Sequence, residues 1–157
     1  MGEKFFTSKE AAKTVGCSLR QLQYWREKDV VVPTIQGSGI GRSIYYSQSD
    51  VVRLAIMEYL LSVGLSFSEA SRGLKELVAA DLNYADRRSK KRWMLCWDEK
   101  SGCDPTSPKG ALGSAPSKRS LVLEEFDRAR AIALLDRGQA VIPIWLDTIH
   151  QRLRSKM

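Results

Sequence analysis

The sequence has little of what most enzyme active sites are built from. His150 is the only histidine in 157 residues, and it is followed by the polar residues Gln151 and Arg152 near the end of the chain. We therefore expect a surface residue there rather than a general base. No phosphate-binding loop, Ser/His/Asp set or spaced pair of carboxylates stands out along the sequence. These absences predict that the chain is not an enzyme and needs no cofactor.

Cysteines and long apolar runs are also scarce. Three cysteines are too few for a disulfide framework, and no apolar run is long enough for a membrane span or a signal peptide. Cys96 and Cys103 are the two cysteines nearest in sequence and are the candidates for a metal or redox pair. Cys96 lies in an apolar run, however, and no third ligand is near. We predict no metal site, no membrane partner and a cytoplasmic location at the nucleoid.

Positive charge is in excess. The net charge is +7 and the isoelectric point is about 9.5, which suits a polyanionic partner. Residues 1–80 hold ten basic and eight acidic residues (+2), and residues 81–157 hold fifteen and ten (+5). Charge alone therefore does not indicate which part of the chain would contact nucleic acid.

Residues 7–46 have the pattern of a winged helix-turn-helix. Thr7 with Glu10, and Ser18 with Gln21, are capping boxes that predict two helix starts, and Gly16 permits the tight turn between them. The β-prone segments 30–32 and 43–46 then predict a two-stranded ribbon with a glycine-rich tip. Alternation requires only one of its two tyrosines to be buried. This fold places one helix in the DNA major groove.

The second helix should have two distinct faces. Leu19, Leu22 and Trp25 are spaced to pack on the first helix. The opposite face carries residue types that read base edges or contact phosphates, namely Arg20, Gln21, Tyr24 and Lys28. On this helix alone, an ordinary solvated polar face explains the pattern equally well.

Three linked motifs resemble those of MerR-family transcriptional regulators. They are the run Leu22-Gln23-Tyr24-Trp25-Arg26-Glu27 with Val30, Val31 and Pro33; Gly41-Arg42 with Tyr45, Tyr46, Ser47, Asp50, Val51 and Leu54; and Val63-Gly64-Leu65-Ser66-Phe67-Ser68-Glu69-Ala70. The resemblance covers about residues 5–77. Gln23 departs from the family pattern, which has arginine there, and the wing tip carries only Arg42 as a basic residue.

The resemblance implies a DNA-binding transcriptional regulator. It would bind double-stranded DNA as a homodimer at a near-palindromic promoter site, where RNA polymerase is a possible partner. The residues predicted to contact DNA are Lys9, Lys13, Ser18, Arg20, Gln21, Tyr24, Lys28, Arg42 and Tyr45. Two alternatives stay open: an architectural, excisionase-like factor without an effector, and a protein-interaction adaptor with a degenerate DNA-binding head.

The rest of the chain predicts two more helices and a small C-terminal domain. Ser47 and Ser66 begin capping boxes, and Gly64 should end the first of the two helices. Residues 78–92 have no sustained heptad repeat. Val78, Leu82 and Ala85 extend one apolar stripe, and the basic run 87–92 is then either a solvated linker or a strip that touches phosphates.

The C-terminal region reads as a short mixture of strands and helices. Expected are strands at 93–97 and 121–123, a mobile loop at 100–119, a helix at 128–137 capped by Asp127, a β-prone segment at 140–144 broken by Pro143, and an amphipathic helix at 145–156. Residues 134–141 resemble the tail of some MerR-like proteins. Trp93, Trp97 and Trp145 form the core of this domain or, alternatively, a self-association surface or ligand pocket.

The predicted fold class is therefore α+β and mainly α. We expect a MerR-like winged helix-turn-helix domain at 1–78 with four helices and a two-stranded wing. A basic linker or short helix at 79–92 and an α+β domain at 93–157 follow.

Overall fold

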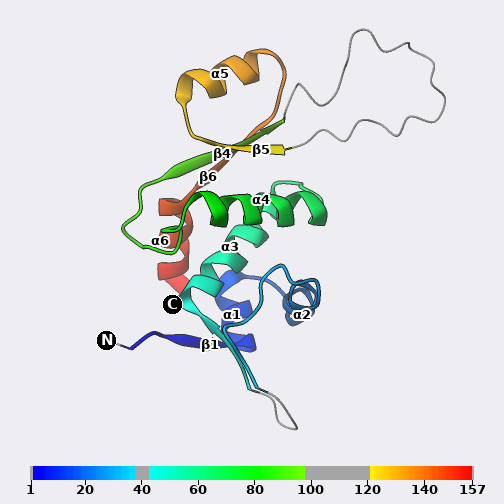
Figure 1. Ribbon diagram of the computed structural model, residues 1–157, viewed down its shortest axis with the longest axis vertical. Coiled ribbons are helices and arrows are strands. Elements are labelled where there is room, and N and C mark those ends of the chain that lie inside the picture. The colour runs from blue at the N-terminus through cyan, green and yellow to red at the C-terminus, as the bar shows by residue number, and fades with distance from the viewer. Residues whose placement is uncertain (1, 38–42, 98–120, 157) are drawn as a thin grey trace, which may run out of the picture. The chain divides into compact units, whose positions relative to one another are not determined.

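A computed structural model describes residues 2–37, 43–97 and 121–156. Within these ranges it contains six helices and two three-stranded sheets, which agrees with the predicted α+β class (Figure 1). The loop expected at 100–119 lies outside the described residues, as does most of the glycine-rich wing tip. No helix in the described part of the chain is long and apolar enough to cross a membrane.

The chain forms two compact units that differ from the predicted division. The first unit combines residues 1–91 with residues 145–157, and the second comprises residues 92–144. The C-terminal helix, which the sequence analysis placed with the tail, thus belongs to the first unit. It contacts α1 and α3 there, because its buried side chains Leu146, Ile149 and Leu153 complete that unit's core.

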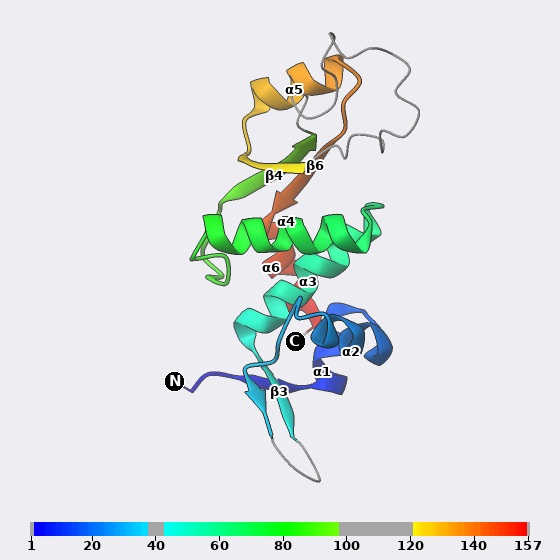
Figure 2. The same cartoon turned by 45° about the vertical axis from the view of Figure 1, so that its right-hand side comes forward.

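The first unit holds five helices and one small sheet. Its elements in chain order are β1 (Phe5–Thr7), α1 (Ser8–Val15), α2 (Leu19–Glu27), β2 (Ile35–Gln36), β3 (Ile44–Ser47), α3 (Gln48–Ser62), α4 (Phe67–Ala80) and α6 (Leu146–Lys156). Figure 2 shows α3 between the α1–α2 pair and α4. Fully buried side chains of α3 and α4, including Leu54, Met57, Leu60, Leu74 and Leu77, fill the centre.

All four predicted capping boxes are present. In each, the Ser or Thr hydroxyl accepts the backbone N–H three residues on, and the side chain there accepts the N–H of the cap residue. Gly16 ends α1 in the left-handed region at φ 89°, which a glycine adopts without strain. Gly64, at φ 100°, follows α3 in the same way.

The sheet of the first unit has the order β1-β3-β2, and both pairings are antiparallel. Tyr46 on the central strand is fully buried and Tyr45 is half-buried, which confirms that only one tyrosine enters the core. The expectation of a strand at 30–32 was wrong. Val31 is buried in a turn-like segment before Pro33, so its apolar character reflects core packing rather than pairing.

The segment after α4 also differs from expectation. The helix ends at Ala80, and Leu82 is 86% exposed, so the apolar stripe does not continue. His150, predicted to lie on the surface, is buried on α6. Its Nε2 donates to the carbonyl oxygen of Tyr84 at 2.9 Å.

The second unit consists of β4 (Arg92–Trp97), β5 (Leu121–Glu125), α5 (Arg128–Asp136) and most of β6 (Val141–Trp145), with sheet order β5-β4-β6. Asp127 caps α5 as predicted, accepting the N–H of Ala129. The strand at 141–145 is not broken at Pro143, which stands in an edge strand where its missing N–H is tolerated.

Candidate nucleic-acid interface

Helix α2 is held in place from one side. Leu22 and Trp25 are each 2% exposed and fix the helix against the core. Leu19 was expected to join them but is 47% exposed. Leu19 is the first residue of α2 and precedes the helical turns that pack on the core. Leu22 and Trp25 are therefore the two α2 side chains that are buried.

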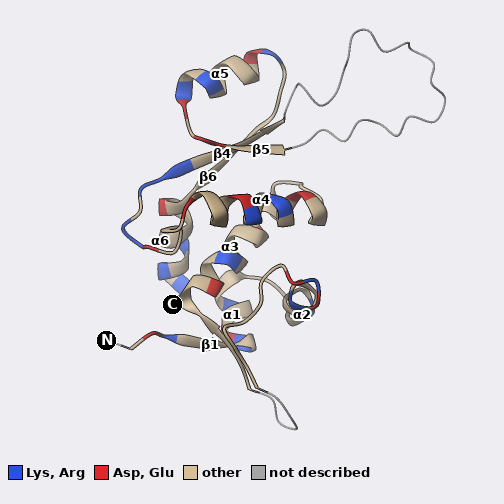
Figure 3. Cartoon of the chain, viewed as in Figure 1, with Lys and Arg blue, Asp and Glu red and all other residues tan. Residues whose placement is uncertain are grey.

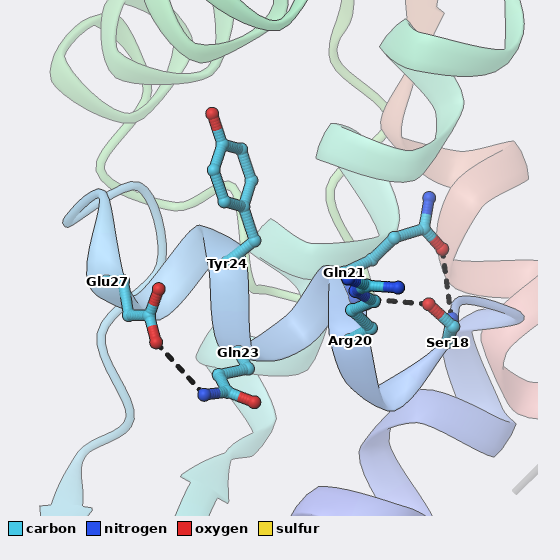
Figure 4. A pocket seen from close by; sticks show the side chains of 6 residues that line it. All are labelled: Ser18, Arg20, Gln21, Gln23, Tyr24 and Glu27. Atoms are coloured by element: carbon cyan, nitrogen blue, oxygen red, sulfur yellow. Dashed lines mark hydrogen bonds between the residues drawn. The ribbon is translucent and has the colours of Figure 1, made fainter.

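The opposite face of α2 borders a shallow hollow of about 390 Å³ (Figure 4). Four of the predicted residues line it together with two others: Ser18, Arg20, Gln21, Gln23, Tyr24 and Glu27. The predicted polar side chains of α2 are thus exposed and brought together on one surface.

Capping fixes the start of this surface. The hydroxyl of Ser18 accepts the backbone N–H of Gln21 at 3.1 Å, and Oε1 of Gln21 accepts the backbone N–H of Ser18 at 2.9 Å. Figure 4 shows the amide nitrogen of Gln21 directed away from this pair. Gln21 therefore presents a hydrogen-bond donor from an ordered side chain, while its acceptor is occupied.

Tyr24 is held between two neighbours. Its ring centroid lies 5.0 Å from that of Phe67 on α4, with the ring planes at 58°. The ammonium of Lys28, the C-cap residue of α2, lies 5.7 Å from the centroid of the Tyr24 ring. The tyrosine remains 44% exposed, so its hydroxyl end is directed by these contacts without being covered.

One acidic group interrupts the basic face. Nε2 of Gln23 donates to Oε1 of Glu27 at 3.0 Å, one helical turn along α2. Among the residues that line the hollow, Arg20 is the cation and Glu27 the anion. The charge of this surface is therefore mixed. Which ligand groups it can bind depends on the positions of its hydrogen-bond donors.

Asp50 connects the β2–β3 hairpin to α3, a role that the sequence analysis missed beyond capping. One carboxylate oxygen, Oδ2, accepts from the backbone N–H and the hydroxyl of Thr34 at 2.9 and 2.6 Å, and from the N–H of Ser47 at 2.9 Å. The side chain is 4% exposed. Beyond β2 and β3, the backbone N–H of Gly37 donates to the carbonyl oxygen of Ser43 at 2.9 Å and extends the pairing of the hairpin.

The remaining predicted residues lie outside the hollow. Lys9 and Lys13 are exposed one turn apart on α1, and Tyr45 is half-buried opposite Thr7 and Ile35 in the sheet. Figure 3 colours the basic positions of the described elements blue, those of α1 among them. Arg42 lies outside the described residues.

Cys17 and Cys96, the two cysteines within the described residues, are thiols that are partly or fully buried. Burial, reinforced by the negative charge of Glu58, raises the pKa of Cys17 to about 11, so its thiol is neutral at physiological pH. Cys96 is buried in β4, and Cys103 lies outside the described residues. The described ranges contain no group of three or more potential metal ligands.

Comparison with known proteins agrees with this geometry. Residues 6–77 match the family model described as "MerR HTH family regulatory protein". The chain is 39% identical over 57 residues to an uncharacterized HTH-type transcriptional regulator of Mycobacterium bovis, and equally to two from Mycobacterium tuberculosis strains. Each match covers 36% of this chain and a quarter of the relative's length. The segment that matches this family model, residues 6–77, carries α1, α2, the β2–β3 hairpin, α3 and most of α4.

Proposed function

We propose that this chain is a DNA-binding transcriptional regulator whose helix α2 reads the major groove. The observation that carries the proposal is the exposed α2 face, where Arg20, Gln21 and Tyr24 border one hollow inside the family-matched region. Arginine and glutamine present the donors that base edges of guanine and adenine accept. Arg20 and Gln21 both project from a helix that is anchored in the core, and the side chain of Gln21 is also fixed by its capping hydrogen bond. Fixed donors favour discrimination between DNA sequences.

In this arrangement α1 and α2 form the helix-turn-helix, and the β2–β3 hairpin forms its wing. Lys28 and the α1 residues Lys9 and Lys13 would contact phosphates beside the groove. Arg42, which lies between β2 and β3 in the sequence, would contact a phosphate further along the duplex. Ser18 and Tyr45 would contribute hydrogen bonds from the edges of the same surface.

A single copy of α2 contacts only a few base pairs, so specific binding favours two copies. We propose a homodimer on a near-palindromic promoter site in the bacterial cytoplasm, with α2 helices in successive major grooves about one helical turn, or roughly 34 Å, apart. Binding at a promoter would bring the protein next to RNA polymerase. Regulation would then act through transcription at that promoter.

The test is a footprint on DNA upstream of the chain's own gene, with the stoichiometry of the complex measured by sedimentation. The proposal predicts one protected dyad site and two protein chains per duplex. Length-dependent coating of any duplex would instead favour an architectural, excisionase-like factor. Absence of salt-dependent binding would favour a protein-interaction adaptor, because phosphate contacts always give a salt dependence.

A further inference from the structure

A second cavity lies within the first unit, away from α2. It has a volume of about 160 Å³ and is formed where α1, α3 and α6 meet. Such a volume is well below the range of drug-sized ligand sites, roughly 300–1,000 Å³, and suits a metabolite of few atoms. The proposed DNA contacts include none of the residues that line it.

Three buried aliphatic side chains and one carboxylate line the cavity, together with the polar residues Thr14, Tyr59 and Ser62. Val15, Ile149 and Leu153 are each less than 9% exposed and present aliphatic side chains. Glu58 of α3 lines the same cavity, and its Oε2 is buried without a hydrogen-bond partner in the described part of the chain. Glu58 as a whole is half-buried, and leaving one of its carboxylate oxygens buried without a partner is unfavourable.

Two cations lie at the outer side. Arg152 and Lys156 are exposed residues of α6 that also line the cavity. The Lys156 ammonium lies near Gly16, 3.7 Å from the position that a Cβ would occupy there. Neither cation forms an ion pair with Glu58. Burial raises the pKa of the Glu58 carboxyl. One acidic and two basic side chains therefore line the same small cavity without pairing with one another.

We propose that this cavity binds a small aliphatic α-amino acid, whose ammonium pairs with Glu58 and whose carboxylate pairs with Arg152 and Lys156. A zwitterion satisfies both charged ends at once, which neither a simple amine nor a simple carboxylate does. Its aliphatic side chain lies on the wall of Val15, Ile149 and Leu153. Because α1 also carries the turn into α2, an occupied cavity stiffens the support of the DNA-contacting helix. The binding itself does not depend on the proposed function.

The test is calorimetric titration of the full chain with L-valine, isobutylamine and isobutyrate, which share an aliphatic group and differ in charge. We expect L-valine to bind at millimolar concentration or below and the other two to bind at least tenfold more weakly. Glu58→Gln should lose L-valine binding at least tenfold, and Arg152→Gln or Lys156→Gln should weaken it severalfold. Glu76→Gln on α4 and Arg154→Gln on α6 remove the same charges outside the cavity and should leave binding unchanged. Circular dichroism confirms that each variant is folded.

Three results would overturn the proposal. The first is no heat from any of the three probes up to 20 mM, on the order of the weakest metabolite sites. The second is isobutylamine or isobutyrate binding as tightly as L-valine, because one charge would then suffice. The third is L-valine binding that Glu58→Gln leaves unchanged, because the ligand would then lie elsewhere. Repeating the titration with DNA absent and present separates this result from the proposed function.

Discussion

The ring of Tyr24 on α2 lies against the ring of Phe67 on α4, with centroids 5.0 Å apart. The two residues are distant in sequence, and Phe67 is the first residue of its helix. Through this contact, a residue outside the helix-turn-helix orients a side chain on the proposed reading face. Lys28, the C-cap residue of α2, adds a cation near the ring.

Phe67→Ala should therefore weaken DNA binding although Phe67 itself touches no base. Loss of an aromatic pair is worth about 0.5–1.5 kcal/mol, so we expect affinity for a specific site to fall by about two- to tenfold. Fluorescence anisotropy with a labelled duplex measures the effect. Phe5→Ala, which removes a partly exposed ring on β1, is the matched control. Unchanged affinity in Phe67→Ala would show that Tyr24 needs no such support.

Asp50→Ala should destabilise the first unit through the hairpin. Three donors from Thr34 and Ser47 would lose a charged acceptor, and hydrogen bonds to charged groups contribute about 1.5–3 kcal/mol each at most. We expect a loss of about 2–4 kcal/mol in the free energy of unfolding, measured by urea denaturation. Asp29→Asn is the control, because asparagine tolerates the left-handed φ of 57° found there. If Asp50→Ala lowered the free energy of unfolding by less than Asp29→Asn does, contacts other than those of Asp50 would hold the hairpin in place.

His150→Ala should also destabilise the protein. The variant leaves the buried Tyr84 carbonyl without its donor and opens space beside α6, at a cost of about 1–3 kcal/mol. Thermal unfolding followed by circular dichroism measures the change. Gln151→Ala, at the exposed neighbouring position, should be nearly neutral. Equal melting temperatures for the two variants would contradict the structural role of His150.

Glu58→Gln should change the dependence of stability on pH. Burial raises the pKa of the folded-state carboxyl, so the folded state holds its proton more tightly than the unfolded state. The wild-type protein then loses stability as pH rises from the unfolded-state pKa through the folded-state pKa. Glutamine has no such proton. We expect Glu58→Gln to melt higher than wild type at pH 7, and the difference to shrink towards pH 4. A constant difference across this range would mean that Glu58 is not desolvated.

Local chemistry allowed much of the first unit to be predicted. Four capping boxes and two glycine turns are short-range signals, and each of them marks a helix end in the structure. The exposed residues of α2 followed from helical spacing, since Leu22 and Trp25 define the buried side and the polar side chains lie opposite.

What escaped prediction depends on contacts between distant residues. Gln151 and Arg152, which follow His150, suggested that it faces solvent, yet a backbone carbonyl 66 residues away supplies its hydrogen-bond partner. Val31 resembled a strand residue because burial and β-propensity select the same side chains. The amphipathic pattern of α6 predicted that one of its faces packs on a core. The pattern does not identify the helices it packs on, α1 and α3, which lie in the N-terminal half of the chain.

The central claim is that α2 reads DNA, and a salt titration of binding tests it most directly. Wild type, Arg20→Ala and Arg42→Ala are compared on the footprinted site and on an unrelated duplex, with Arg128→Ala on α5 as control. We predict that Arg20→Ala lowers the preference for the specific site by about 1–3 kcal/mol, and that Arg42→Ala weakens both duplexes alike with a salt slope shallower by about 1. Weak binding that neither substitution changes would contradict the claim and make the α2 surface a site for some other partner.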